Sequence, residues 1–210
     1  MHSNDSFRDV SRRLSTDQKR SHTSMFDERK VAQAAAYFLD RRGGEMAHLK
    51  LMKLLYLADR ESMRRYGEPI SQDRMVSMPH GPVLSQTYDL MAGCSPSTGA
   101  DDGWDAWIAD IQDYQVKLRR PVDHEALGQL SEADLEILDD VWNQFGAMSR
   151  WEIRDYTHDK CPEWEDPNGS SKPLKPESVF QALGRTPEES KQLAENLREK
   201  REIDALFASL

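Results

Sequence analysis

The sequence predicts a mainly α fold of the α+β kind: a compact helical domain with a small antiparallel β element and a charged C-terminal helix. Apolar residues recur at helical spacing in several long segments, and glycines stand where those segments end. Short alternating stretches typical of strands are few. The chain has 210 residues, enough for one domain with a real core and short for two full domains.

Composition divides the chain into three regions. Residues 1–24 are rich in Ser, Asp, Arg and Lys and predict a flexible N-terminal tail. Residues 25–185 carry the helical patterns and are expected to form the domain. Residues 186–210 predict a highly charged amphipathic helix whose sparse apolar stripe includes Leu206 and Phe207.

The first two helices have clear boundaries. Asp27 is placed to cap a helix over residues 28–41, which the glycine pair after it stops. A second helix is expected over residues 48–65, ending at Gly67. Its apolar face is so wide that we expect a central helix, contacted from several sides.

The middle of the chain predicts the β element. Residues 72–79 alternate weakly and are expected to form a strand. Pro82 would then stand in the first turn of a helix over residues 82–92, where its missing N–H costs nothing. Residues 114–118 also alternate, and we expect this segment to pair with the 72–79 strand.

Two further helices are marked by their N-caps. Ser131 caps a helix with a clear apolar face that runs to residue 145. Ser149 and Glu152 form a capping-box pattern that opens a helix over residues 150–157.

Charge and composition limit the partners. The net charge of −9 opposes broad binding to nucleic acid or anionic membranes, so a nucleic-acid partner is not expected. No run of about 18 apolar residues occurs, and no membrane association is expected. The N-terminus lacks an apolar signal core and the chain has two cysteines, which indicates a cytoplasmic protein with free thiols.

No residue pattern identifies a catalyst or a cofactor. His158 and Cys161 have the spacing of two metal ligands, but a structural zinc site needs four and no second such pair exists. We therefore expect no metal, no cofactor and no enzymatic activity. A hydrolase using these two residues is an alternative, although a cysteine followed by proline among aromatics is more typical of packing.

Arg60, Arg64 and Arg65 form a basic end to the second helix. One interpretation is that they complement the helix dipole and are solvated. The other is a docking face for an acidic partner or a phosphate backbone.

The tripeptide His80-Gly81-Pro82 also has two interpretations. It is either a turn that fixes a strand and a helix at an angle, or a corner that presents His80 to a partner. Trp151 and Trp164 likewise have two interpretations. Each is either a partly buried core residue or an anchor of a binding interface.

Several of these segments together resemble a known family, the Panacea antitoxin domain, which includes the SocA-like proteolysis-promoting proteins. The resemblance covers roughly residues 26–185. It is carried by Leu49-Lys-Leu-Met-Lys-Leu-Leu-Tyr-Leu-Ala58, Gly67-Glu-Pro-Ile70, His80-Gly-Pro-Val83 followed by Tyr88, Leu130-Ser-Glu-Ala-Asp-Leu-Glu-Ile-Leu138, and Thr157-His158 with Pro162 and Trp164.

The resemblance implies a mostly helical, non-enzymatic antitoxin of a bacterial or phage toxin–antitoxin system. Its expected partner is a protein toxin encoded nearby, which it would neutralise by binding or, as a SocA-like adaptor, by delivery to the ClpXP protease. The candidate toxin-binding residues are His80, Gly81, Pro82, Tyr88, Trp151, His158, Trp164, Leu206 and Phe207. A DNA-binding autoregulator of its own operon is the alternative, but it would need an exposed basic recognition helix.

Overall fold

The computed structural model describes residues 26–97, 101–111 and 113–208. The flexible tail predicted over residues 1–24 lies outside them. The described elements, in chain order, are α2 (Glu28–Arg42), β1 (Glu45–Ala47), α3 (His48–Tyr66), β2 (Met75–Met78), β3 (Gly81–Leu84), α4 (Ser85–Met91), α5 (Trp104–Trp107), β4 (Ile108–Ile111), β5 (Gln115–Leu118), the 3-10 turn His124–Ala126, α6 (Glu132–Phe145), α7 (Arg150–Lys160), β6 (Lys172–Pro173), α8 (Pro176–Ala182) and α9 (Pro187–Ala208). The predicted mainly α (α+β) class is confirmed.

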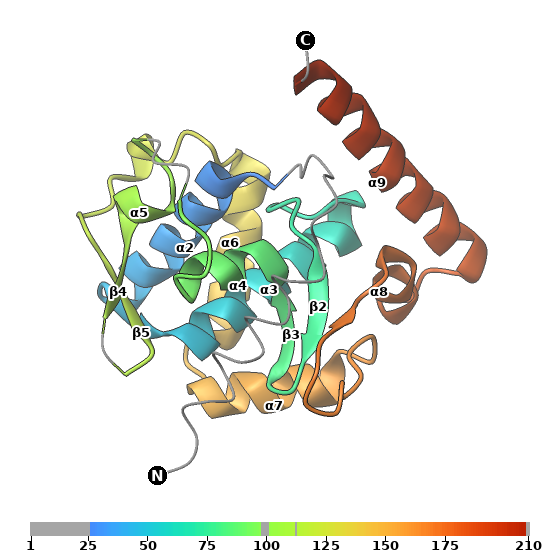
Figure 1. Cartoon of the computed structure of the whole chain (residues 1–210), viewed down its shortest axis with the longest axis horizontal. Coiled ribbons are helices and arrows are strands. Elements are labelled where there is room, and N and C mark those ends of the chain that lie inside the picture. The colour runs from blue at the N-terminus through green and yellow to red at the C-terminus, as the bar shows by residue number, and fades with distance from the viewer. Residues whose placement is uncertain (1–25, 98–100, 112, 209–210) are drawn as a thin grey trace.

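Helix α3 runs through the centre of the molecule, as its wide apolar face predicted (Figure 1). Helices α2, α6 and α7 and strand β3 all pack against it. Its Leu51 and Leu54 side chains are fully buried. The cap at Asp27 is confirmed, because its side chain accepts a hydrogen bond from the Lys30 N–H, and Gly43 ends α2 in a left-handed conformation.

The strands form two small antiparallel sheets, with the orders β1-β5-β4 and β3-β2-β6. The predicted pairing between the segments 72–79 and 114–118 is therefore wrong. Strand β2 pairs with β3 and β6, whereas β5 pairs with β1 and β4. Both β1 and β6 are too short to show alternation in the sequence, so these two partners of β5 and β2 gave no signal.

The predicted start of a helix at Pro82 is also wrong. Pro82 lies opposite Ser77 in the edge strand β3, where a residue without an N–H is tolerated. Helix α4 begins only at Ser85. The Asp73 carboxylate satisfies its first N–H groups, accepting from Gln86 at 3.0 Å and from Thr87 at 2.8 Å.

The capping patterns of α6 and α7 are confirmed. Ser131 caps α6, and Asp134 completes a capping box that was not predicted from the sequence. Ser149 and Glu152 form the predicted box at α7, which continues three residues beyond the expected end, to Lys160.

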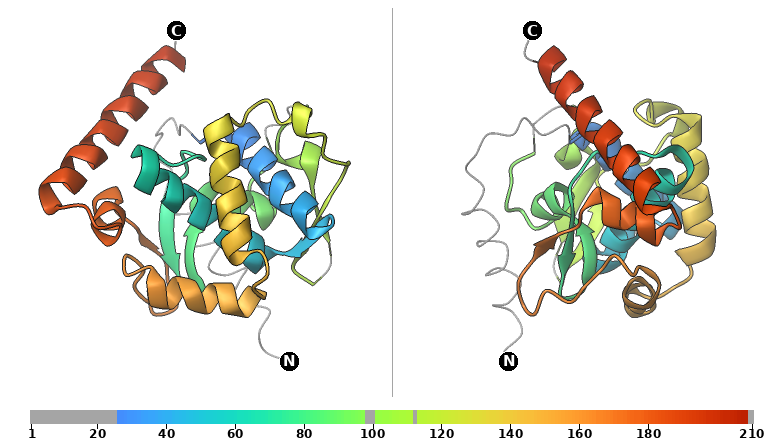
Figure 2. Two further views of the ribbon diagram at one scale, coloured as in Figure 1. Left: turned by 180° about the vertical axis from the view of Figure 1, so that it is seen from behind. Right: turned by 90° about the vertical axis from the view of Figure 1, so that its right-hand side faces the viewer.

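Helix α9 projects away from the rest of the molecule at its C-terminal end (Figure 2). Its first half packs on α8 and the body, with Ala194 and Leu197 buried. Its last turns expose Ile203, Leu206 and Phe207. Within the described ranges, none of the helices combines the length and the apolar character needed to cross a membrane.

Candidate protein-binding site

The turn between β2 and β3 forms a rigid corner that points toward α7 (Figure 1). Its tip carries His80, which is exposed. Gly81 follows with φ +94°, and a Cβ there would lie 2.8 Å from Thr157 Oγ1 and 2.9 Å from Lys53 Nζ. Only glycine fits this position, because it tolerates positive φ and the neighbouring side chains leave no room.

Lys53 supports the corner from inside the molecule. Its side chain is fully buried, and Nζ donates a hydrogen bond to the Pro82 carbonyl oxygen at 2.6 Å. Burial lowers the pKa of Lys53 well below its ordinary value. This role of Lys53 was not predicted from the sequence.

A stacked pair of rings connects the corner to α7 and to the segment after it. The Trp164 Nε1–H donates to the Met78 carbonyl oxygen at 3.0 Å. The Trp164 ring lies parallel to the His158 ring, with centroids 4.0 Å apart and an interplanar angle of 4°. Burial, followed by the nearby Lys53 charge, lowers the pKa of His158, which favours its neutral imidazole.

The outer side of α7 continues this surface. Trp151 is 47% exposed, and the guanidinium carbons of Arg150 and Arg154 each lie 4.9 Å from its ring centroid. Trp151, Arg154 and His158 follow one another at helical spacing and therefore share one face of α7. Partial burial of the ring and then the Arg154 charge lower the pKa of His80, consistent with the corner lying beside that face.

We call this surface the α7–corner face and define it as His80, Trp151, Arg154, His158 and Trp164. Four of the five were predicted from the sequence as candidates, and the structure brings them together. Arg154 was not predicted.

The remaining candidates lie elsewhere. Gly81 and Pro82 are buried beneath the corner and shape it. Tyr88 is half-buried on α4, beyond the opposite end of β3. Leu206 and Phe207 are 63% and 69% exposed near the tip of α9, which lies at the other end of the molecule from α7 in both Figures 1 and 2.

The three arginines of the proposed basic docking face all have carboxylate partners within the chain. Arg60 Nε donates to the buried Glu163 Oε1 at 2.6 Å. Arg64 and Arg65 both bind Glu61. Docking through these arginines stays a prediction, and their internal pairing argues against it.

Cys161 lacks the environment of a nucleophile. Its side chain is fully buried, and burial raises the pKa of the thiol to about 12. An activated cysteine is partly exposed and has a lowered pKa, so the hydrolase alternative gains no support. In the described part of the chain, no three His, Cys, Asp or Glu side chains are grouped to hold a metal ion.

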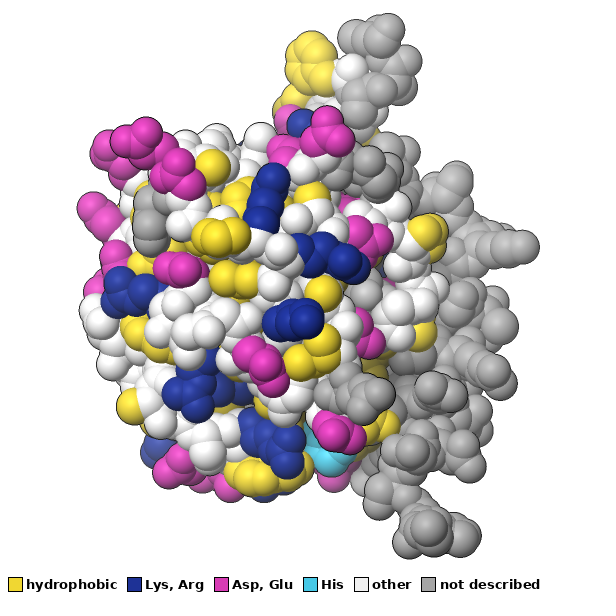
Figure 3. Space-filling model, turned by 90° about the vertical axis from the view of Figure 1, so that its left-hand side faces the viewer, with side chains coloured by type: hydrophobic (Ala, Val, Ile, Leu, Met, Phe, Trp, Pro, Cys, Tyr) yellow, Lys and Arg dark blue, Asp and Glu magenta, His cyan; other side chains and the backbone are white. Residues whose placement is uncertain are grey.

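The DNA-binding alternative gains no support from the helix on which it rested. The basic helix that it requires is α3, which is central rather than exposed. Figure 3 shows another face of the molecule, on which basic side chains are interrupted by acidic, apolar and uncharged ones. A helix-turn-helix reader would instead present a continuous basic element to the DNA backbone.

Comparison with known protein families agrees with the resemblance seen in the sequence. A family model described as "Antitoxin SocA-like, Panacea domain" matches residues 51–165. The chain belongs to this antitoxin family. No curated protein and no solved structure matched the chain. The matched range contains the whole α7–corner face and Lys53, and it excludes α9.

Proposed function

We propose that this antitoxin-family chain neutralises a protein toxin encoded nearby by binding it directly through the α7–corner face. The observation that supports this proposal is Trp151, a large aromatic side chain held half-exposed between two arginines. Tryptophan and arginine are the residues most enriched at the energetic centres of protein interfaces. Here they stand together beside a stacked histidine–tryptophan pair.

The face is also organised before any partner arrives. Trp164 is fixed by its hydrogen bond to Met78 and by its stacking on His158. The corner is held by Lys53. Side chains that are already ordered lose little conformational entropy on binding, which improves affinity for a given contact area.

Charge is expected to act mainly on the rate and specificity of the encounter. The chain has a net charge of −9, which favours a basic toxin through long-range attraction. Arg150 and Arg154 are a local basic exception. Arg154 already pairs with Asp155 of its own helix, at 2.5 Å, so Arg150 is the arginine that would pair with an acidic group of the toxin.

We further propose that the tip of α9 makes a second contact with the toxin. Ile203, Leu206 and Phe207 are exposed and recur at helical spacing. Such an apolar stripe is the form in which amphipathic helices dock into a partner's groove. Full neutralisation by a chain that lacks residues 187–210 would reject this second contact.

The decisive test replaces Trp151 with alanine and measures rescue of cells that express the adjacent gene. Loss of an interface centre weakens binding by about 2 kcal/mol or more, roughly thirtyfold, so rescue should fail. Tyr66 is a matched control, because it is 53% exposed on α3 and outside the face. Tyr66→Ala should rescue normally, and normal rescue by Trp151→Ala would contradict the proposal.

The same assay separates direct neutralisation from delivery to a protease. Rescue in hosts with and without ClpXP would indicate occlusion by binding. Rescue only in the host with ClpXP would indicate a proteolytic adaptor. If the neighbouring gene is not toxic, salt-dependent binding of the chain to its upstream DNA becomes the next experiment.

A further inference from the structure

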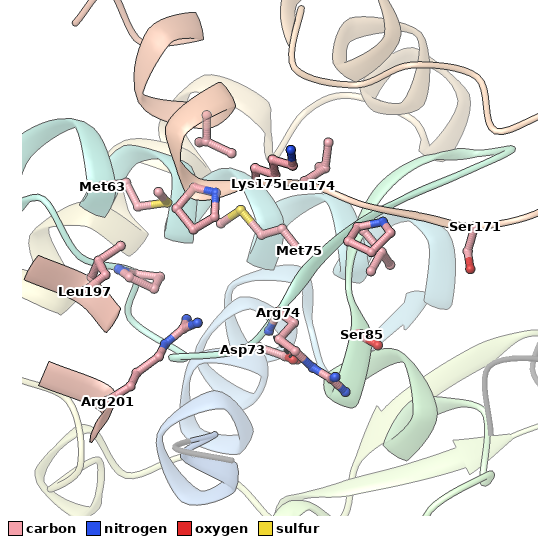
Figure 4. A pocket seen from close by; sticks show the side chains of 15 residues that line it. Met63, Asp73, Arg74, Met75, Ser85, Ser171, Leu174, Lys175, Leu197 and Arg201 are labelled. Carbon is pink, nitrogen blue, oxygen red and sulfur yellow. Dashed lines mark hydrogen bonds between the residues drawn. The ribbon is translucent and has the colours of Figure 1, made fainter. Parts of the chain in front are cut away.

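A concave site lies apart from the α7–corner face. A cavity of about 300 Å³ is formed between β2, the segment from β6 to α8, and α9 (Figure 4). Its walls are largely apolar and include Met63, Met75, Pro173, Val179 and Leu197. This volume is at the small end of the range for ligand sites, so it suits a single ring or a short aliphatic group.

Three cationic side chains also line the cavity. Arg201 reaches from α9 toward β2 across the cavity, whereas Arg74 and Lys175 are exposed at its rim (Figure 4). In the described ranges, none of the ion pairs within 4.0 Å involves any of these three. The buried Arg201 Nε has no hydrogen-bond partner either.

The acidic side chain in the cavity wall is already engaged. The Asp73 carboxylate accepts hydrogen bonds from the N–H groups of Arg74, Gln86 and Thr87, and from the Thr87 hydroxyl. Burial lowers the pKa of Arg201, and the attraction of Asp73 and Asp59 acts in the opposite direction. A guanidinium held in a partly buried site without a bonded anion is costly, and an incoming carboxylate would relieve that cost.

We propose that this cavity binds a carboxylate attached to an apolar group. The carboxylate would bind the Arg201 guanidinium, and the apolar group would pack against Met63, Met75 and Leu197. Asp73 in the wall disfavours a doubly charged phosphate, because the two negative groups would repel each other at close range. A carboxylate carries one charge and matches the planar donor geometry of arginine.

The chemistry can be tested with 3-phenylpropionate and its uncharged analogue 3-phenylpropanamide, titrated into the purified full chain and followed by calorimetry. The acid should bind at least tenfold more tightly than the amide. Arg201→Gln should remove that preference, while Arg198→Gln should keep it, because Arg198 is exposed on the same helix and does not line the cavity. Matching thermal melts would establish that both variants fold.

Three results would overturn the proposal: no binding of the acid, equal binding of acid and amide, or equal losses in the two arginine variants. A peptide, acetyl-Gly-Gly-Phe with a free C-terminal carboxylate, distinguishes the sources of the ligand. Tighter binding than 3-phenylpropionate would point to the end of a polypeptide, and weaker binding to a small free acid. The experiment uses no toxin, so its failure would leave the proposed neutralisation untouched.

Discussion

The region around α3 and the helix α9 differ in where their polar side chains lie. Around α3, charged and polar groups are buried and bonded to segments far away in the sequence. On α9, most charges are exposed, and so are the large apolar residues of its last turns. The first arrangement fixes one geometry, whereas the second leaves a surface to be covered by something else.

Four residues of α3 show how the fixed geometry is built. Lys50 Nζ donates to the carbonyl oxygens of Gly146 and Met148, both at 2.6 Å, and Lys53 holds the corner. Tyr56 and Arg60 both donate to Glu163. One helix therefore positions the α6–α7 connection, the corner and the segment before Trp164. Removing a hydrogen-bond partner of one of these α3 side chains should therefore lower the free energy of unfolding far more than removing a partner of an α9 side chain.

The largest effect is expected from Glu163→Ala, because the change leaves the Arg60 charge without its carboxylate and the Tyr56 hydroxyl without its acceptor. Breaking a buried ion pair costs about 3–5 kcal/mol of unfolding free energy. Glu68→Ala is the matched change, because it removes the exposed ion pair between Glu68 and Lys200 of α9. It should cost less than about 1 kcal/mol of unfolding free energy. Urea unfolding of both variants measures the difference, and similar losses would contradict the contrast.

Asp59, also on α3, should make stability depend on pH. Burial raises the pKa of Asp59 to about 7. Between about pH 4 and 7 the folded chain holds a proton that the unfolded chain has released, so stability falls as pH rises through that window, by up to about 4 kcal/mol.

Asp59→Asn tests this, because an amide resembles the protonated acid and can keep bonds to the Ser71 N–H and hydroxyl. The variant should be more stable than the wild type at pH 8, and the two should converge near pH 4. Unfolding free energies measured at several pH values give the two curves. Parallel curves would mean that Asp59 does not titrate as proposed.

A third, somewhat smaller loss of stability is expected from a substitution at the corner between β2 and β3. Gly81→Ala combines positive-φ strain with close contacts to Thr157 and Lys53, and should cost about 3 kcal/mol. Gly43→Ala shares the positive φ but has nothing within 4 Å of the added Cβ, so it should cost about 1 kcal/mol. Equal losses would show that the corner yields to a side chain and is not rigid.

These contrasts also explain what the sequence could predict. Helix boundaries depend on local caps, so Asp27, Ser131 and Ser149 located them correctly. The sheets could not be predicted, because β1 and β6 are two or three residues long and their pairing is decided by tertiary contacts.

The candidate site shows the same limit. His80, Trp151, His158 and Trp164 could each be recognised as unusual, but their convergence depends on how α7 packs below the corner. Lys53 was missed because a lysine on a helix is ordinarily solvated. Its position inside a wide apolar face was the signal that could have identified it.

The smallest changes in stability are expected on α9, and they should differ between its two halves. Leu197 is 5% exposed where the helix packs on the body, and Leu197→Ala should cost about 2 kcal/mol in unfolding free energy. Phe207 is 69% exposed, and Phe207→Ala should change stability by less than about 0.5 kcal/mol. If Phe207→Ala nevertheless weakens rescue in the toxicity assay, the tip acts on the partner and not on the fold. A clear loss of stability in Phe207→Ala would instead show that α9 is packed along its whole length, and the contrast between the two regions would fail.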